Sequence, residues 1–251
     1  MGVYKDVTEF YERYDGVKLV YGKSERGLNL YALKAGKGDA ARAIVQAGIH
    51  AREYVNAYVL MKMILKYRDF KHAVWFLPLT NPDGADICEN GKPLYKANAR
   101  GVDLNVNFDA GWGTGKYNVK TQGDENYIGE FPFSEKESAA IGAFTLRVKP
   151  SVTVSYHTKG EEIYFDFGQT GERYRKDKEI AKAVSEVTGY KIVENLPSAG
   201  GYKDWCVEKL GIPSLTIETG KDELTHPVGK EYADEIYAKN ELVIERIFER
   251  L

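Results

Sequence analysis

The chain has 251 residues, of which 43% are hydrophobic and 29% charged, and its formal net charge is −2. Its length suits one large domain or two small ones, and the composition is ordinary for a globular protein with a sizeable core. The near-neutral balance of scattered Lys and Arg predicts no binding of nucleic acid or of an anionic membrane. Cys88 and Cys206 are far apart in the sequence, so neither a disulfide framework nor a cysteine metal site is expected.

Targeting signals are not visible in the sequence as given. It has no run of eighteen apolar residues, and the N-terminus lacks the apolar core of a signal peptide. On this basis we expect a cytoplasmic protein without a membrane-spanning segment.

Apolar residues recur with helical or strand periodicity along the chain. Helices are predicted at residues 4–14, 53–67, 134–148, 172–188, 201–210 and 229–251. Strands are predicted at residues 17–21, 28–35, 40–49, 73–77, 152–156, 163–167 and 214–217. Because helices and strands alternate without a linker or a repeat, we predict a single α/β domain over residues 1–251. Its sheet should be twisted, mixed and mostly parallel, with about eight strands and with helices on both faces.

Two local signals refine this prediction. Ser134 and Glu137 have the spacing of a capping box, which would open the helix at 134–148. Residues 84–133 follow a turn signal and show little periodicity. An irregular stretch of this length inside a compact domain is usually functional.

Three of the predicted strands end in a side chain that can bind a metal ion or transfer a proton. His50, His157 and Glu218 stand at the carboxyl ends of the strands at 40–49, 152–156 and 214–217 respectively. Ligands of open α/β sheets bind outside the carboxyl ends of the strands, so we expect these side chains to meet at one edge.

His50 and Glu53 lie three residues apart where a strand passes into a helix, so both can turn toward one point. With His157 they would form a Zn²⁺ site that leaves a coordination position for water. Zinc would lower the pKa of that water and polarise a carbonyl, and Glu218 could carry the water's proton to a leaving amine. His226 is the other candidate for the third ligand, but His157 is preferred because a buried strand precedes it.

Five ordered segments resemble the motif set of the zinc metallocarboxypeptidases: Gly48–Glu53, Asn81–Gly84, Gly101–Asn105, Ser155–His157 and Thr216–Glu218. The resemblance covers the chain from about Tyr21 to the end. It implies the metallocarboxypeptidase fold and one Zn²⁺ ion held by His50, Glu53 and His157, with Glu218 as general base and acid. This ligand set is the one used by carboxypeptidase A, a member of that family.

The resemblance also implies roles for residues around the metal. Arg52 and Asn105 match positions that contact the substrate. Lys96 falls where the family usually has an Arg that stabilises the oxyanion, and Arg100 is a competing assignment because loop lengths differ. Lys203 matches the floor of the pocket for the leaving residue, where a cation favours an acidic group. The alternative interpretation of Lys203 is a surface lysine on the predicted short helix.

Two positions depart from the family pattern. The Asn-Arg pair that grips a C-terminal carboxylate reads Asn105-Val106 here, which removes the charge that a buried carboxylate needs. The position of a mobile Tyr is occupied by Leu196, and Tyr202 is a candidate substitute.

These departures, and the segment from Ser155 to Tyr164, resemble the bacterial branch of γ-D-glutamyl-meso-diaminopimelate peptidases. That resemblance implies a muropeptide substrate, with recognition through extra carboxylates beside the scissile bond. The first alternative is a zinc carboxypeptidase that removes C-terminal residues, including acidic ones. The others are a deacylase of N-acyl amino acids and a non-catalytic zinc- or peptide-binding protein on the same fold.

Overall fold

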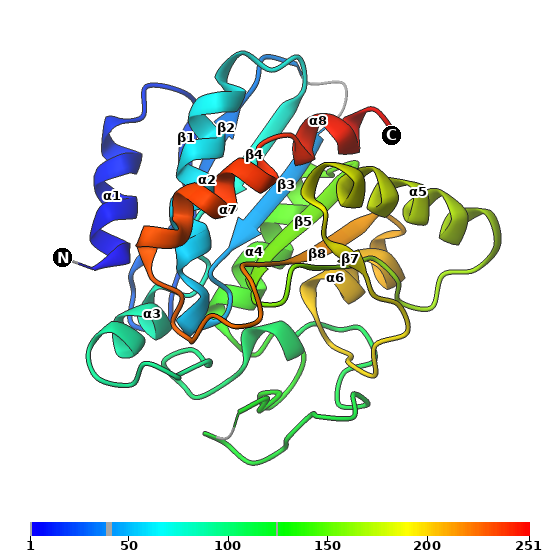
Figure 1. The fold of residues 1–251 in the computed structure, drawn as a ribbon. Coiled ribbons are helices and arrows are strands. Elements are labelled where there is room, and N and C mark those ends of the chain that lie inside the picture. The colour runs from blue at the N-terminus through cyan, green and yellow to red at the C-terminus, as the bar shows by residue number, and fades with distance from the viewer. Residues whose placement is uncertain (1, 39–41, 124) are drawn as a thin grey trace.

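One sheet runs through the computed structural model, which describes residues 2–38, 42–123 and 125–251 (Figure 1). Its strands are β1 (Lys18–Lys23), β2 (Asn29–Ala35), β3 (Arg42–Ala47), β4 (Ala73–Leu77), β5 (Val152–Thr158), β6 (Glu162–Tyr164), β7 (Lys191–Ile192) and β8 (Ser214–Thr219). They are arranged in the order β1-β2-β4-β3-β5-β8-β6-β7. The predicted strand at 40–49 begins, at residues 40 and 41, outside the described residues.

The centre of the sheet is parallel and its flanks are mixed. Strands β4, β3, β5 and β8 pair in parallel with one another. The pairs β1–β2, β2–β4 and β6–β8 are antiparallel, and β7 is parallel to β6. The predicted mixed and mostly parallel sheet is therefore confirmed.

Helices cover both faces of the sheet (Figure 1). One face packs against α1 (Val3–Arg13), α2 (Val55–Lys66), α5 (Gly171–Thr188), α7 (Ala233–Asn240) and α8 (Val243–Phe248). The other face packs against α4 (Lys136–Val148) and α6 (Tyr202–Trp205). Because side chains alternate across a strand, the neighbours Ile44 and Val45 on β3 enter the two different cores. None of the described helices combines the length and apolar character needed to cross a membrane.

Three local predictions differ from the structure. Helix α3 (Pro82–Glu89) begins inside the predicted turn, because Asn81 caps it by accepting from the amide of Gly84 and Pro82 suits the first turn. The predicted capping box is wrong, since α4 begins after Glu135 and the Ser134 hydroxyl donates to the Glu135 carboxylate.

The long helix predicted at 229–251 is divided into a 3-10 turn (Lys230–Tyr232), α7 and α8. The break follows Asn240, whose buried side-chain amide donates to the carbonyl oxygen of Ile236 and to the Tyr190 hydroxyl. Such a side chain competes with the backbone for helical hydrogen bonds, which explains why the helix ends there.

The parallel centre of the sheet brings the predicted site residues to one edge. His157 on β5 and Glu218 on β8 are direct register partners. His50 follows β3, which pairs with β5 on the side of β5 that faces away from β8.

The turn after β3 favours a glycine at position 48. Gly48 has a φ of 62°, and a Cβ added there would lie 2.7 Å from Cδ1 of Leu79. Its carbonyl oxygen accepts from the amide of Asn81 at 2.9 Å, which fixes the turn against the end of β4. This turn carries the chain to His50 at the edge of the sheet.

We expect Gly48→Ala to lower the free energy of unfolding by about 2–4 kcal/mol, because left-handed strain adds to a steric clash. Gly27→Ala is the matched control, since Gly27 also has a positive φ of 87° but nothing within 4 Å of the added Cβ. That variant should lose only about 1 kcal/mol. Urea unfolding of both variants at one zinc concentration measures the difference, and equal losses would show that contact with Leu79 does not constrain the turn.

Candidate metal centre and active site

Three buried side chains converge at the carboxyl ends of β3 and β5. Nδ1 of His50 lies 2.8 Å from Oε1 of Glu53, and Nδ1 of His157 lies 2.9 Å from Oε2 of the same carboxylate. The two Nδ1 atoms are 3.2 Å apart. A tetrahedral zinc site with bonds of about 2.0–2.2 Å places its ligand atoms about 3.3 Å apart. These residues could therefore hold a metal ion.

Further contacts hold the His50 imidazole and the main chain of His157. Nε2 of His50 lies 3.2 Å from Oδ1 of Asp103, which favours a proton on Nε2 and leaves Nδ1 as an electron-pair donor. The Asn56 amide and the Thr219 hydroxyl both donate to the main-chain carbonyl of His157, at 2.9 and 3.1 Å. The donor set is thus held in place by the fold, as a metal site requires.

Charge is concentrated in this buried group. Burial alone would raise the pKa of Glu53, but the neighbouring imidazoles of His50 and His157 outweigh it and hold that pKa well below its ordinary value. Burial alone would lower the pKa of His50, but the negative charges of Glu53 and Asp103 outweigh burial and raise that pKa to about 9. A cation is therefore favoured between these carboxylates, and a metal ion would take the place of the His50 proton.

Glu218 lies half-buried beside the same group. Burial, together with the negative charge of Glu53, raises the pKa of Glu218 well above its ordinary value. A carboxyl group at this position can exchange a proton with a neighbouring water or amine.

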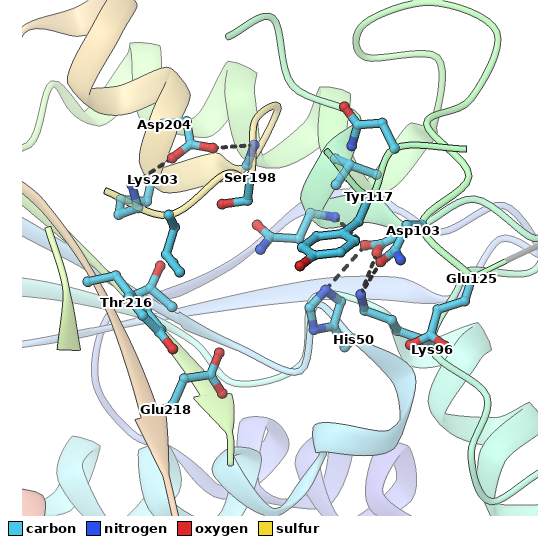
Figure 2. Close-up of a pocket in the computed structure, with 17 residues that line it drawn as sticks. His50, Lys96, Asp103, Tyr117, Glu125, Ser198, Lys203, Asp204, Thr216 and Glu218 are labelled. Atoms are coloured by element: carbon cyan, nitrogen blue, oxygen red, sulfur yellow. Dashed lines mark hydrogen bonds and ion pairs between the residues drawn. The ribbon is translucent and has the colours of Figure 1, made fainter. Parts of the chain in front are cut away.

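A cavity of about 320 Å³ opens beside His50 and Glu218 (Figure 2). Lys203 and Asp204 line one end of it, and Lys96 and Glu125 lie beyond His50 at the other end. Figure 2 shows the labelled Tyr117 side chain over the middle of the cavity. The cavity thus has a charged group of each sign at both ends.

The structure separates the two candidates for the oxyanion cation. Lys96 lines the cavity, and its Nζ lies 2.8 Å from Oδ2 of Asp103. Arg100 does not line it and pairs with Glu130 at 3.1 Å and with Glu135 at 3.5 Å. The Arg100 assignment is therefore corrected, since its guanidinium is held by carboxylates outside the cavity.

Tyr202 also requires correction as a substrate-binding residue. Its ring is completely buried, and its hydroxyl lies 2.7 Å from the hydroxyl of Thr145 on α4. Tyr202 belongs to the core between α6 and the sheet and cannot replace the Tyr missing at position 196. Leu196 itself lines the cavity and is 42% exposed.

The remaining predicted residues lie at or near the cavity. Asn105 and Val106 line it, and the Asn105 side-chain oxygen accepts from the amide of Tyr202. Arg52 contacts Glu125 at the rim. His226 is half-buried and close enough to Glu53 for the two charges to interact, but it is not part of the described group that could hold a metal.

Several cavity residues were not predicted from the sequence. Asp103 belongs to one of the recognised segments, but its contacts with His50 and Lys96 required coordinates. Tyr117 and Glu125 come from the irregular stretch at 84–133, where length was the only signal of function. Asp204 follows the predicted Lys203 directly and pairs with it.

Residues 4–233 match the family model described as zinc carboxypeptidase. The chain belongs to that family. This confirms the resemblance inferred from the five segments, and with it the zinc-peptidase class.

Two curated relatives and one solved structure illustrate the relationship. The chain is 30% identical over 230 residues to gamma-D-glutamyl-L-diamino acid endopeptidase 1 of Lysinibacillus sphaericus, covering 76% of this chain. It is 28% identical over 241 residues to human carboxypeptidase B2, covering 80% of this chain. In both cases it spans 57% of the relative's own length.

The structure of bovine thrombin-activatable fibrinolysis inhibitor, in complex with tick carboxypeptidase inhibitor, superposes with a TM-score of 0.83 at 21% identity. The alignment covers 98% of this chain and 94% of that chain. This likeness confirms the metallocarboxypeptidase fold that the sequence predicts.

We expect His157→Ala to weaken zinc binding by more than about 100-fold, because loss of even an outer-shell partner costs about 10–100-fold. His226→Ala is the matched control and should keep its zinc, since His226 lies outside the group that could hold a metal. Zinc content after dialysis against a graded chelator measures both variants. Retention by His157→Ala together with loss by His226→Ala would transfer the ligand role to His226.

Proposed function

We propose that this protein is a zinc peptidase that hydrolyses the amide bond between γ-D-glutamate and meso-diaminopimelate in peptidoglycan stem peptides. The observation that carries the proposal is the paired Lys203 and Asp204 at the floor of the cavity. Nζ of Lys203 lies 2.6 Å from Oδ1 of Asp204, and the two residues are 8% and 3% exposed.

This floor suits a leaving residue whose side chain ends in both an ammonium and a carboxylate. Lys203 donates to Asp204 and to the carbonyl oxygen of Asp166, so one of its three donors is left for a ligand carboxylate. Asp204 accepts from Lys203 and from the amide of Gly201 and keeps further lone pairs for a ligand ammonium. Diaminopimelate carries both groups at the far end of its side chain, whereas a simple acidic side chain would leave Asp204 facing a like charge.

The other supports are the cavity wall and one relative. Val106 lines the cavity where the family pattern has the Arg that binds a terminal carboxylate. Among the described residues that line the cavity, the basic side chains are Lys96 and Lys203, with His50 the imidazole. The relative from Lysinibacillus sphaericus is named for cleavage between γ-D-glutamate and a diamino acid.

His50, Glu53 and His157 would hold the zinc ion, which when bound polarises the scissile carbonyl and acidifies water. Glu218 takes the proton from the attacking water and passes it to the leaving amine. Lys96, held by Asp103, provides positive charge near the developing oxyanion. We propose the single domain over residues 1–251 as the catalytic unit.

Glu218→Gln should keep its zinc and lose at least about 100-fold in kcat, because an amide cannot carry the proton. Glu162→Gln is the matched control, since Glu162 is the register partner of Glu218 on β6 but does not line the cavity. Its kcat should change by less than about tenfold. Near-normal turnover by Glu218→Gln would refute the assignment of Glu218 as the base.

The substrate is tested by comparing L-Ala-γ-D-Glu-meso-diaminopimelate with a blocked dipeptide that ends in Glu. We expect kcat/KM to be at least about 100-fold higher for the tripeptide, because only its leaving residue satisfies both Lys203 and Asp204. Hydrolysis of the dipeptide alone, or of both at equal rates, would instead favour a carboxypeptidase that removes acidic residues. Stoichiometric zinc with no turnover of any peptide would favour a binding protein.

A further inference from the structure

At the end of the cavity opposite Lys203, the lining residue Glu125 forms an ion pair with Arg52, which lies behind it and does not line the cavity. Nη2 of Arg52 is 3.0 Å from Oε1 of Glu125, and Nη1 of Arg52 donates to the carbonyl oxygen of Leu94 at 3.1 Å. Arg52 belongs to the 3-10 turn Ala51–Glu53, next to Glu53 of the metal group. The guanidinium is therefore positioned by the same turn that positions the metal group.

The two partners in this pair differ in how firmly they are held. The side chain of Arg52 is 19% exposed and bound to a main-chain carbonyl, whereas that of Glu125 is 56% exposed. Glu125 lies on the irregular stretch and lines both the main cavity and an adjoining hollow of about 120 Å³. Glu125 is thus the partner that a ligand can displace.

The order of residues along the cavity indicates which part of the substrate would lie near this pair. Lys203 and Asp204 occupy one end, Lys96 and Glu125 the other, and His50 and Glu218 lie between them (Figure 2). If the leaving residue occupies the end at Lys203, the acyl residue must extend toward Lys96 and Glu125. A substrate carboxylate at that end would lie beside Lys96, and it would meet Arg52 once Glu125 has moved aside.

We propose that Glu125 occupies the place of a carboxylate of the acyl residue, and that a substrate carrying this carboxylate displaces Glu125 from Arg52 when it binds. This inference rests on the proposed function. A D-glutamyl residue linked through its γ-carbonyl keeps a free α-carboxylate three carbon atoms from the scissile carbonyl. That carboxylate takes over the pairing with Arg52, so the guanidinium is never left without a partner.

An ordinary surface ion pair is the competing explanation, and the chain provides a direct comparison. Glu130 pairs with Arg100 at 3.1 Å, and the two side chains are 64% and 42% exposed. Neither residue lines the cavity. Glu130→Gln is therefore the matched control for Glu125→Gln, since both glutamates lie on the irregular stretch and each variant removes one carboxylate from an Arg–Glu pair.

The experiment compares L-Ala-γ-D-Glu-meso-diaminopimelate with the same peptide amidated at the D-glutamyl α-carboxylate. In the zinc-loaded Glu125→Gln variant, we expect the KM for the carboxylate peptide to fall about two- to five-fold, the size expected for loss of an exposed competing ion pair. The kcat should not change, and the KM for the amidated peptide should fall by less. The Glu130→Gln variant should behave as the wild type does with both peptides.

Equal changes in KM for the two peptides, or equal effects of the two variants, would overturn the proposal. If the wild type cleaves neither peptide, the proposed function fails, and calorimetry with N-acetyl-D-glutamate then decides the inference separately. Binding that is about two- to five-fold tighter in zinc-loaded Glu125→Gln than in the wild type and in Glu130→Gln would support displacement of Glu125. Unchanged binding would overturn it.

Discussion

The rest of the site depends on the contacts of the Glu53 carboxylate with two imidazoles. Each of its oxygens faces the Nδ1 atom of one imidazole, at 2.8 Å for His50 and 2.9 Å for His157. His50 reaches Asp103 through its other nitrogen, and Asp103 reaches Lys96. A buried charge is tolerated only when it is paired, so this alternation of acid and base explains how so many ionisable groups can share one buried region. It also links the metal group to the cation that we propose for the oxyanion.

The cavity around this group presents paired charges rather than isolated ones. Lys203 is paired with Asp204 at one end, and Arg52 with Glu125 at the other. An unpaired cation would favour any carboxylate, whereas a pair favours ligands that satisfy or displace its anion. We infer that selectivity in this protein depends on the substrate's charge pattern on both sides of the scissile bond. Val106 stands where the family pattern has the Arg that binds a C-terminal carboxylate.

The sequence allowed the sheet, the family and the metal group to be predicted, because local periodicity marks the strands and short ordered motifs mark the family and its ligands. His157 and Glu218 could be placed because parallel strands end at one edge of a sheet, and they are register partners in the structure. The contacts of Tyr202, Arg100 and Glu125 could not be predicted. Tyr202 and Arg100 find partners on α4 and on the irregular stretch, and the position of Glu125 depends on how that stretch folds over the cavity.

The central claim is that the paired floor of the cavity recognises a zwitterionic side chain. It is tested most directly by the kcat/KM of the wild-type protein for L-Ala-γ-D-Glu-meso-diaminopimelate and for the same peptide with L-Lys as the leaving residue. The two leaving residues share an ammonium, but only diaminopimelate adds the carboxylate that Lys203 can bind. We predict at least about tenfold preference for the diaminopimelate peptide, the usual contribution of one charged hydrogen bond. Equal kcat/KM values for the two peptides would contradict this account.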